Sequence, residues 1–244
     1  MILSRYIPNT FTMANLFCGM LGTYFAATNR LEFAAYAVVL GIFFDFFDGF
    51  FARILKAQSE LGLQLDSLAD VITSGVVPGM VMYQLLHRIE NWGGGVKWVE
   101  QELHWESLSL LPFLGFAITL ASAYRLAKFN IDTRQTDSFI GLPTPANALL
   151  IISLPLILIY DSYPVVEEII SNKGFLLGLT ALSCYLLNAE LPLFALKFKT
   201  WGFAENKVRY IFLIIAALLL AFLQFLAVPL IIVMYVIISF AVKK

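Results

Sequence analysis

The sequence predicts an all-α membrane protein, a bundle of about eight transmembrane helices around a six-helix catalytic core. Of its 244 residues, 60% are hydrophobic and only 14% are charged, and the mean hydropathy is +0.82. This composition lies outside that of soluble globular domains. The apolar residues form long runs, unlike the alternating segments of about 10 residues in membrane barrels. Because lipid offers no hydrogen bonds to the backbone, such runs favour helices. We expect one integral-membrane domain over residues 1–244.

The apolar runs, taken in order, give the expected spans. They are residues 11–28, 33–56, 62–86, 108–125, 146–160, 174–196 and two shorter helices within 210–242, the C-terminal spans thus covering 174–242. Pro8 is expected to begin the first helix, with Asn9 or Thr10 as its cap. Pro78 and Gly79 can kink the third helix. The C-terminal run is too long for one span, so a break is expected near Pro229, and the total falls to six or seven if this run is re-entrant.

The basic residues are unequally divided between the two sides of this topology. Four of the 16 Lys and Arg residues fall on one side, at Arg30, Arg88, Lys97 and Lys173, and the other 12 fall on the opposite side. The positive-inside rule then places both termini, and the turn between the second and third helices, in the cytoplasm. The expected location is a prokaryotic cytoplasmic membrane.

Four aspartates lie in the helical hairpin of residues 33–86, at Asp45, Asp48, Asp66 and Asp70. At 100° per residue, each pair shares one face of its helix. With the neighbouring residues of the same faces, the first arc is about 140° (Asp45, Asp48, Gly49, Ala52 and Arg53) and the second about 80° (Gly62, Asp66, Asp70 and Thr73). A short connection makes the helices antiparallel neighbours, so the two acidic faces can meet. Ionised carboxylates are costly beside lipid and need cations or protons. Oxygen ligands suit Mg²⁺ or Mn²⁺, and the lack of nearby His or Cys argues against zinc.

Small residues and one arginine share these faces. Gly49, Ala52 and Gly62 leave space for a ligand or for close helix packing. Arg53 can bind a phosphate beside the metals, or anchor the helix end at the cytoplasmic surface.

The hairpin resembles the signature of the CDP-alcohol phosphatidyltransferases. The pattern D-x-x-D-G-x-x-A-R, eight residues, then G-x-x-x-D-x-x-x-D is met in full from Asp45 to Asp70. The resemblance implies that Asp45, Asp48 and Asp66 bind two divalent metals. It also implies that Asp70 is the general base and can contact the second metal. The residues then expected to bind the CDP-lipid are Asn9, Thr12, Gly49, Ala52, Arg53 and Gly62.

Three further stretches are similar to the phosphatidylserine synthase branch of that family. They are IPNTFTMANLFCG, SLADVITSGVVP and AYRLAKFNIDTRQTDSFIGLPTPANA, in which Lys128 replaces an Arg and Ser74 replaces a Phe. The resemblance implies transfer of the phosphatidyl group from CDP-diacylglycerol to the hydroxyl of L-serine, giving phosphatidylserine and CMP, and suggests a homodimer.

The connector of residues 125–147 suits an amino-acid acceptor. Cationic Arg125 and Lys128 can hold the serine carboxylate, with Asn130 near its ammonium group. The alternative is that Arg125, Lys128 and Arg134 form a patch that binds lipid headgroups at a helix end.

Other functions remain open at this point. The acceptor can instead be glycerol 3-phosphate or an inositol phosphate, although a phosphorylated acceptor calls for more basic residues. Intramembrane prenyltransferases also bind Mg²⁺ diphosphates, but through two distant acidic motifs. A cation transporter would place its site nearer the bilayer midplane. No nucleic-acid polymer is expected as a partner.

Overall fold

The protein is described by a computed structural model that places residues 3–92, 109–132, 139–161, 163–193 and 202–242. Nearly all of these residues are helical. Phe139–Ile140 (β1) and Pro192–Leu193 (β2) form a short antiparallel pair. The all-α prediction is therefore confirmed.

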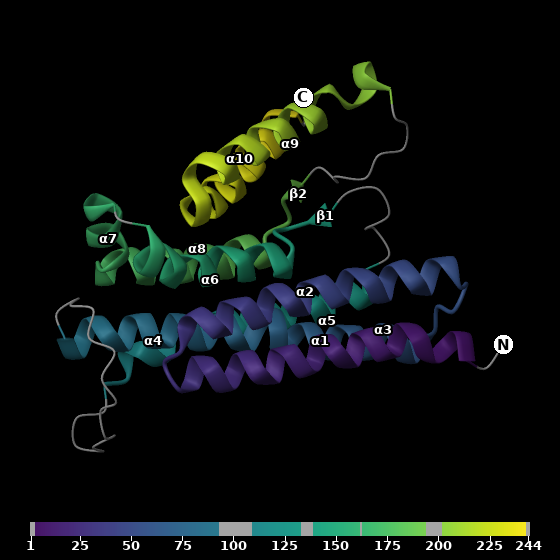
Figure 1. The fold of residues 1–244 in the computed structure, drawn as a ribbon, viewed down its shortest axis with the longest axis horizontal. Coiled ribbons are helices and arrows are strands. Elements are labelled where there is room, and N and C mark those ends of the chain that lie inside the picture. Colours follow the sequence, from purple (N-terminus) through teal and green to yellow (C-terminus); the bar gives the residue numbers. More distant parts are fainter. Residues whose placement is uncertain (1–2, 93–108, 133–138, 162, 194–201, 243–244) are drawn as a thin grey trace.

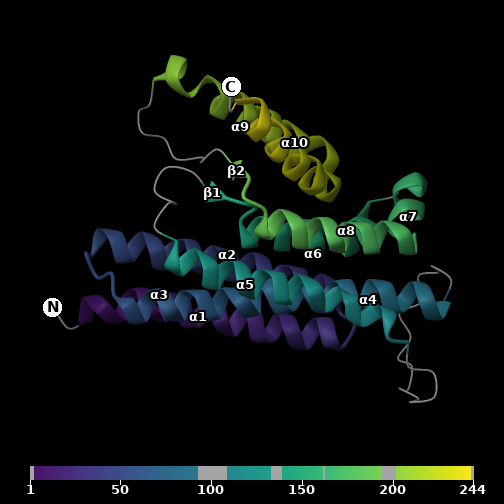
Figure 2. The ribbon, with the colours of Figure 1, turned by 180° about the vertical axis from the view of Figure 1, so that it is seen from behind.

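The N-terminal half forms the lower layer in Figure 1. Helix α1 (Leu3–Ala27) packs along α2 (Leu31–Ile54). The chain then continues through α3 (Glu60–Asp70), the π-helix η1 (Val71–Val76) and α4 (Val77–Trp92), which together form one long rod beside α1. Figure 2 shows that α5 (Ala117–Ile131), preceded by the 3₁₀-helix η3 (Leu111–Phe116), completes this layer.

Two further layers lie above it. Helices α6 (Thr144–Tyr160) and α8 (Lys173–Asn188) form the middle layer, and the short α7 (Pro164–Ile170) connects them. Helices α9 (Phe203–Leu223) and α10 (Ala227–Val242) lie side by side as the upper layer, joined by η4 (Gln224–Leu226). The β1–β2 pair lies between these layers, at the end where α6 begins.

The main apolar core lies between the lower and middle layers. Val38, Val77, Ile118 and Ile151 are fully buried in it, contributed by α2, α4, α5 and α6. Helix α6 is buried along most of its length. Burial of these apolar side chains fixes the lower-layer helices against α6, and with them the acidic hairpin.

Several described helices can cross a membrane. Leu31–Ile54, Glu60–Glu90 and Asn206–Phe240 are long and apolar enough, and a fourth span is possible if Pro164–Ile170 and Lys173–Asn188, bent by 68°, act as one. Their exposed apolar side chains suit lipid contact. The total of eight spans stays a prediction.

Some predicted boundaries are wrong. Helix α1 begins at Leu3, so Pro8 lies inside it and does not start it. Helix α5 runs to Ile131, which places the first part of the predicted connector on a helix. The predicted break near Pro229 is confirmed, since α9 and α10 are separated at Gln224–Leu226, just ahead of that proline. Pro229 lies in the first turn of α10, where a missing N–H breaks no helical hydrogen bond.

Two other helices also differ in length from the predicted ones. The predicted third helix ended at residue 86, but α4 continues to Trp92, so His87 and the polar residues that follow it up to Trp92 are helical. Helix α8 ends at Asn188, earlier than the predicted residue 196. In both cases, the change from apolar to polar residues along the sequence did not mark the residue at which the helix ends.

Candidate functional site

The acidic hairpin is built from the end of α2 and the start of α3. The turn between them ends at Ser59, whose side chain caps α3 by accepting a hydrogen bond of 3.0 Å from the Gly62 N–H. Lys56 in the same turn has a φ of 50°, in the left-handed region. This tight reversal turns the chain back on itself, and the aspartates of α2 and α3 meet as predicted.

Three carboxylates converge at this end of the hairpin. One oxygen each from Asp45, Asp48 and Asp66 lies within 4.8 Å of the other two. Within the described part of the chain, Asp66 Oδ1 is buried and has no hydrogen-bond partner. A buried carboxylate oxygen without a partner is costly, and a cation would satisfy it. The donor set, oxygens only, fits Mg²⁺ or Mn²⁺.

Asp70 lies one helical turn further along, beside this group. Its Oδ1 accepts a hydrogen bond of 3.2 Å from Asn15 Nδ2 on α1. Asp70 is buried, as is Asn15. Asp70 thus lies beside the three-aspartate cluster without belonging to it. This arrangement suits a base that acts beside bound metals.

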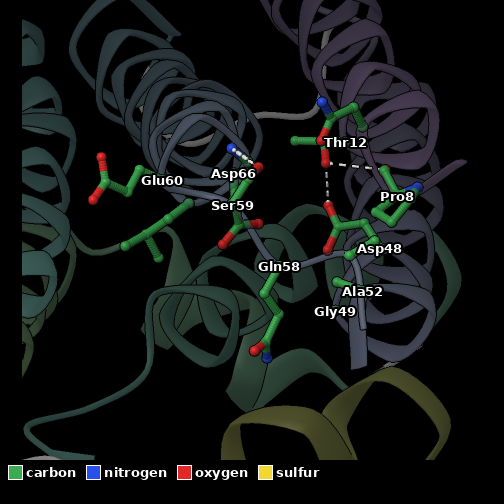
Figure 3. A pocket seen from close by; sticks show the side chains of 13 residues that line it. Pro8, Thr12, Asp48, Gly49, Ala52, Gln58, Ser59, Glu60 and Asp66 are labelled. Atoms are coloured by element: carbon green, nitrogen blue, oxygen red, sulfur yellow. Dashed lines mark hydrogen bonds between the residues drawn. The ribbon is translucent and has the colours of Figure 1, made fainter. Parts of the chain in front are cut away.

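A second α1 residue contacts the cluster directly. Thr12 Oγ1 donates a hydrogen bond of 2.7 Å to Asp48 Oδ2 and also lies 3.2 Å from the Pro8 carbonyl oxygen. Figure 3 shows the Thr12 hydroxyl between these two partners. The shorter distance indicates that the hydroxyl proton is donated to Asp48. Thr12 therefore orients one of the predicted metal ligands.

A pocket of about 470 Å³ opens beside the cluster, between α1, α2 and α3. It is lined by Pro8, Asn9, Thr12, Asp48, Gly49, Ala52, Ala57, Gln58, Ser59, Glu60, Gly62, Leu63 and Asp66. An added Cβ at Gly49 would meet nothing within 4 Å, so this glycine faces open space. The predicted nucleotide-side residues thus share one pocket, except Arg53, which is exposed and outside the lining.

The three predicted acceptor residues lie elsewhere on α5. The buried Arg125 guanidinium donates hydrogen bonds of 2.8 Å to the Ile140 carbonyl, 2.7 Å to the Leu187 carbonyl and 3.2 Å to the Gly141 carbonyl. Much of its hydrogen-bonding capacity therefore serves to hold β1 and the end of α8 against α5.

Lys128 and Asn130 also have protein partners. Lys128 Nζ forms a salt bridge of 3.4 Å with Glu190, and Asn130 Nδ2 donates a hydrogen bond of 2.9 Å to Ser67 Oγ. Ser67 is adjacent to Asp66 in sequence. Of the three residues predicted to bind the acceptor alcohol, Asn130 is therefore the one hydrogen-bonded to the helix that carries Asp66 and Asp70. None of the three, Arg125, Lys128 or Asn130, is in the lining of the pocket beside Asp48.

Sequence reasoning gave no role to Asn15, Gln58 or Ser59. The sequence did contain a signal for Asn15, because Asn15 lies three residues after Thr12 and therefore on the same face of the first helix. Gln58 and Ser59 line the pocket from a turn, where no helical periodicity points to a site.

Comparison with known proteins agrees with this geometry. The sequence model of the CDP-alcohol phosphatidyltransferase family matches residues 5–180. A Bacillus subtilis protein named CDP-diacylglycerol–serine O-phosphatidyltransferase is 33% identical over 154 residues, covering 62% of this chain and 75% of the relative. A Helicobacter pylori protein of the same name is 34% identical, covering 59% and 55%. One from Methanocaldococcus jannaschii is 32% identical, covering 60% and 58%.

The family match extends from α1 into α8 and includes the whole acidic hairpin. The alignments span between about half and three quarters of these relatives. With 176 of 244 residues matched (5 to 180 inclusive), this chain belongs to the CDP-alcohol phosphatidyltransferase family.

Proposed function

We propose that this protein transfers the phosphatidyl group of CDP-diacylglycerol to L-serine, releasing CMP and phosphatidylserine. The observation that carries the proposal is the convergence of Asp45, Asp48 and Asp66 beside a pocket lined by the small residues of the family signature. The names of the relatives support serine as the acceptor.

The pocket supplies the nucleotide side of the site. Gly49, Ala52 and Gly62 leave room for the cytidine diphosphate, and Asn9 and Gln58 offer amides to its polar edges. The absence of side chains at the two glycines lets the diphosphate approach the carboxylates closely. Two divalent cations held by Asp45, Asp48 and Asp66 would neutralise the charge of the diphosphate and of the departing CMP.

Asp70 is the proposed base. In the reaction, the serine hydroxyl oxygen forms a new bond to the phosphorus of the phosphatidyl group, and the bond from that phosphorus to the oxygen of CMP breaks. The hydroxyl proton passes to Asp70, and CMP leaves with the bonding electrons. Burial of Asp70 away from bulk water favours serine over water as the nucleophile.

Asn130 is the acceptor-binding residue that geometry favours among the three predicted. Its link to Ser67 places it against α3, on the helix that carries Asp66 and Asp70. All three residues would contact serine only by exchanging present partners. Arg125 and Lys128 lack such a link to α3, so we assign them a supporting role in shaping this side of the site.

The test is a CMP-release assay on the purified protein. With CDP-diacylglycerol and Mg²⁺ or Mn²⁺, addition of L-serine should release CMP, and addition of glycerol 3-phosphate or inositol phosphate should not. Release with a phosphorylated alcohol alone would change the acceptor and keep the reaction class. Absence of release with every alcohol would overturn the proposal.

A further inference from the structure

Asn15 lies at the centre of the contacts between α1 and the acidic hairpin. Its side chain is fully buried, with an exposed fraction of 0%. Its side-chain Nδ2 donates a hydrogen bond of 3.2 Å to Asp70 Oδ1. Its backbone carbonyl oxygen accepts a hydrogen bond of 3.1 Å from Thr73 Oγ1. Asn15 is therefore bound at two points of one segment, at Asp70 through its side chain and at Thr73 of η1 through its backbone.

The packing around this amide leaves it little freedom. An added Cβ at Gly41 of α2 would lie 3.0 Å from Asn15 Oδ1 and 2.6 Å from Thr73 Cγ2. An added Cβ at Gly19 of α1 would lie 2.5 Å from Thr73 Oγ1. Close approach at the two glycines thus presses α1, α2 and η1 around Asn15. A side chain so confined can fix the orientation of the group to which it donates.

The π-helix contributes to the same arrangement. It begins at Val71, directly after Asp70, and includes Thr73. Single π-turns within α-helices are rare and occur frequently at functional sites. Thr73, which donates to the Asn15 backbone carbonyl, lies within this π-helix. The irregular backbone therefore lies where α1 contacts the segment that follows Asp70.

The stability of the fold does not account for an asparagine at this position. Among the described residues, Asn15 Oδ1 is buried and has no hydrogen-bond partner. An amide that is only partly satisfied in the interior costs free energy, and an apolar residue of the same shape avoids that cost. Leucine has nearly this shape. Leucine would, however, leave Asp70 Oδ1 without its donor, and this bond is the only one that the Asn15 side chain makes within the described residues, so the advantage of the asparagine lies at Asp70.

From these contacts we infer that Asn15 is a positioning residue for Asp70, an inference that rests on the proposed function. Its N–H engages Oδ1 of Asp70 and fixes the carboxylate plane, which leaves Oδ2 to take the acceptor proton. Because an amide N–H can only donate, Oδ1 is kept as an acceptor throughout. Asn15 belongs neither to the pocket lining nor to the three-aspartate cluster, so we expect its effect to fall on turnover and not on binding.

The test compares Asn15→Leu with Ser122→Ala. Ser122 on α5 is equally buried, and its hydroxyl has no partner among the described residues, so its loss controls for a change in buried polarity. We expect Asn15→Leu to lower kcat about 10- to 100-fold, the range for residues that orient functional groups. The KM for CDP-diacylglycerol and the Kd for Mn²⁺, measured by electron paramagnetic resonance, should stay within about twofold.

One further readout separates positioning from a structural role. The thermal midpoint of Asn15→Leu should stay close to that of the wild type, because removal of the unsatisfied Oδ1 offsets the donor that Asp70 loses. If Asn15→Leu does not fold, Asn15→Ala takes its place with the same expected loss of kcat.

The inference is overturned by a wild-type kcat in the variant, or by a fall in Mn²⁺ affinity and thermal midpoint that parallels the fall in kcat. Either result, with an active wild type, leaves the proposed function standing. A wild type that releases no CMP with any alcohol overturns the proposed function and this inference together.

Discussion

Replacing Thr12 with valine tests how the site holds its metal ligands. The substitution keeps the shape of the side chain and removes the 2.7 Å hydrogen bond to Asp48 Oδ2. A hydrogen bond to a charged group contributes about 1.5–3 kcal/mol. Since 1.4 kcal/mol is a factor of ten, we expect Mn²⁺ to bind about tenfold to a hundredfold more weakly. A titration followed by electron paramagnetic resonance measures this affinity directly, without turnover.

Thr10→Val is the matched control for this experiment. Thr10 lies two residues earlier on α1, and its hydroxyl donates 2.9 Å to the Tyr6 carbonyl, but it is exposed and contacts no carboxylate. Both substitutions therefore change helix propensity alike and remove one hydroxyl donor, but only Thr12→Val removes a hydrogen bond to a carboxylate. Equal Mn²⁺ affinity in the two variants would refute the idea that Thr12 orients Asp48 for metal binding.

Three further predictions concern the base, the packing and the arginine. Asp70→Asn should abolish CMP release while CDP-diacylglycerol binding, measured by calorimetry, stays near the wild-type value; substantial turnover would remove Asp70 as the base. Gly115→Ala should destabilise the fold by about 1–3 kcal/mol, because the added Cβ would lie 2.6 Å from the Tyr83 backbone nitrogen, whereas Gly178→Ala meets nothing within 4 Å and should leave the thermal midpoint unchanged or raised. Arg125→Met should lower the thermal midpoint, since three carbonyls lose their donor; an unchanged midpoint with a raised KM for serine would instead support direct serine binding.

The acidic hairpin was predictable because local rules determine it. Helical periodicity places each pair of aspartates on one face, and a short turn reverses the chain so that the two acidic faces can meet. The structure accordingly brings Asp45, Asp48 and Asp66 within metal-binding distance. Most of the predicted nucleotide side also shares one pocket, since Gly49, Ala52 and Gly62 lie on those same faces.

The contribution of α1 and the partners of Arg125 were harder to predict. The bond between Asn15 and Asp70 joins residues 55 positions apart, and its register depends on the close approach at Gly19 and Gly41. Arg125 has partners on two segments distant in sequence, which no local pattern reveals. Helix α5 continues past Arg125 because its polar residues find partners there, including Asn130 with Ser67.

The central claim is tested most directly by identifying the lipid product under competition. Purified protein is incubated with CDP-diacylglycerol, Mn²⁺ and equal amounts of L-serine, glycerol 3-phosphate and inositol phosphate, and the lipids are analysed by mass spectrometry. We predict phosphatidylserine as the main product, and its loss on adding EDTA or in Asp45→Asn. A lipid carrying a phosphorylated headgroup as the main product, or undiminished phosphatidylserine from Asp45→Asn, would contradict the account.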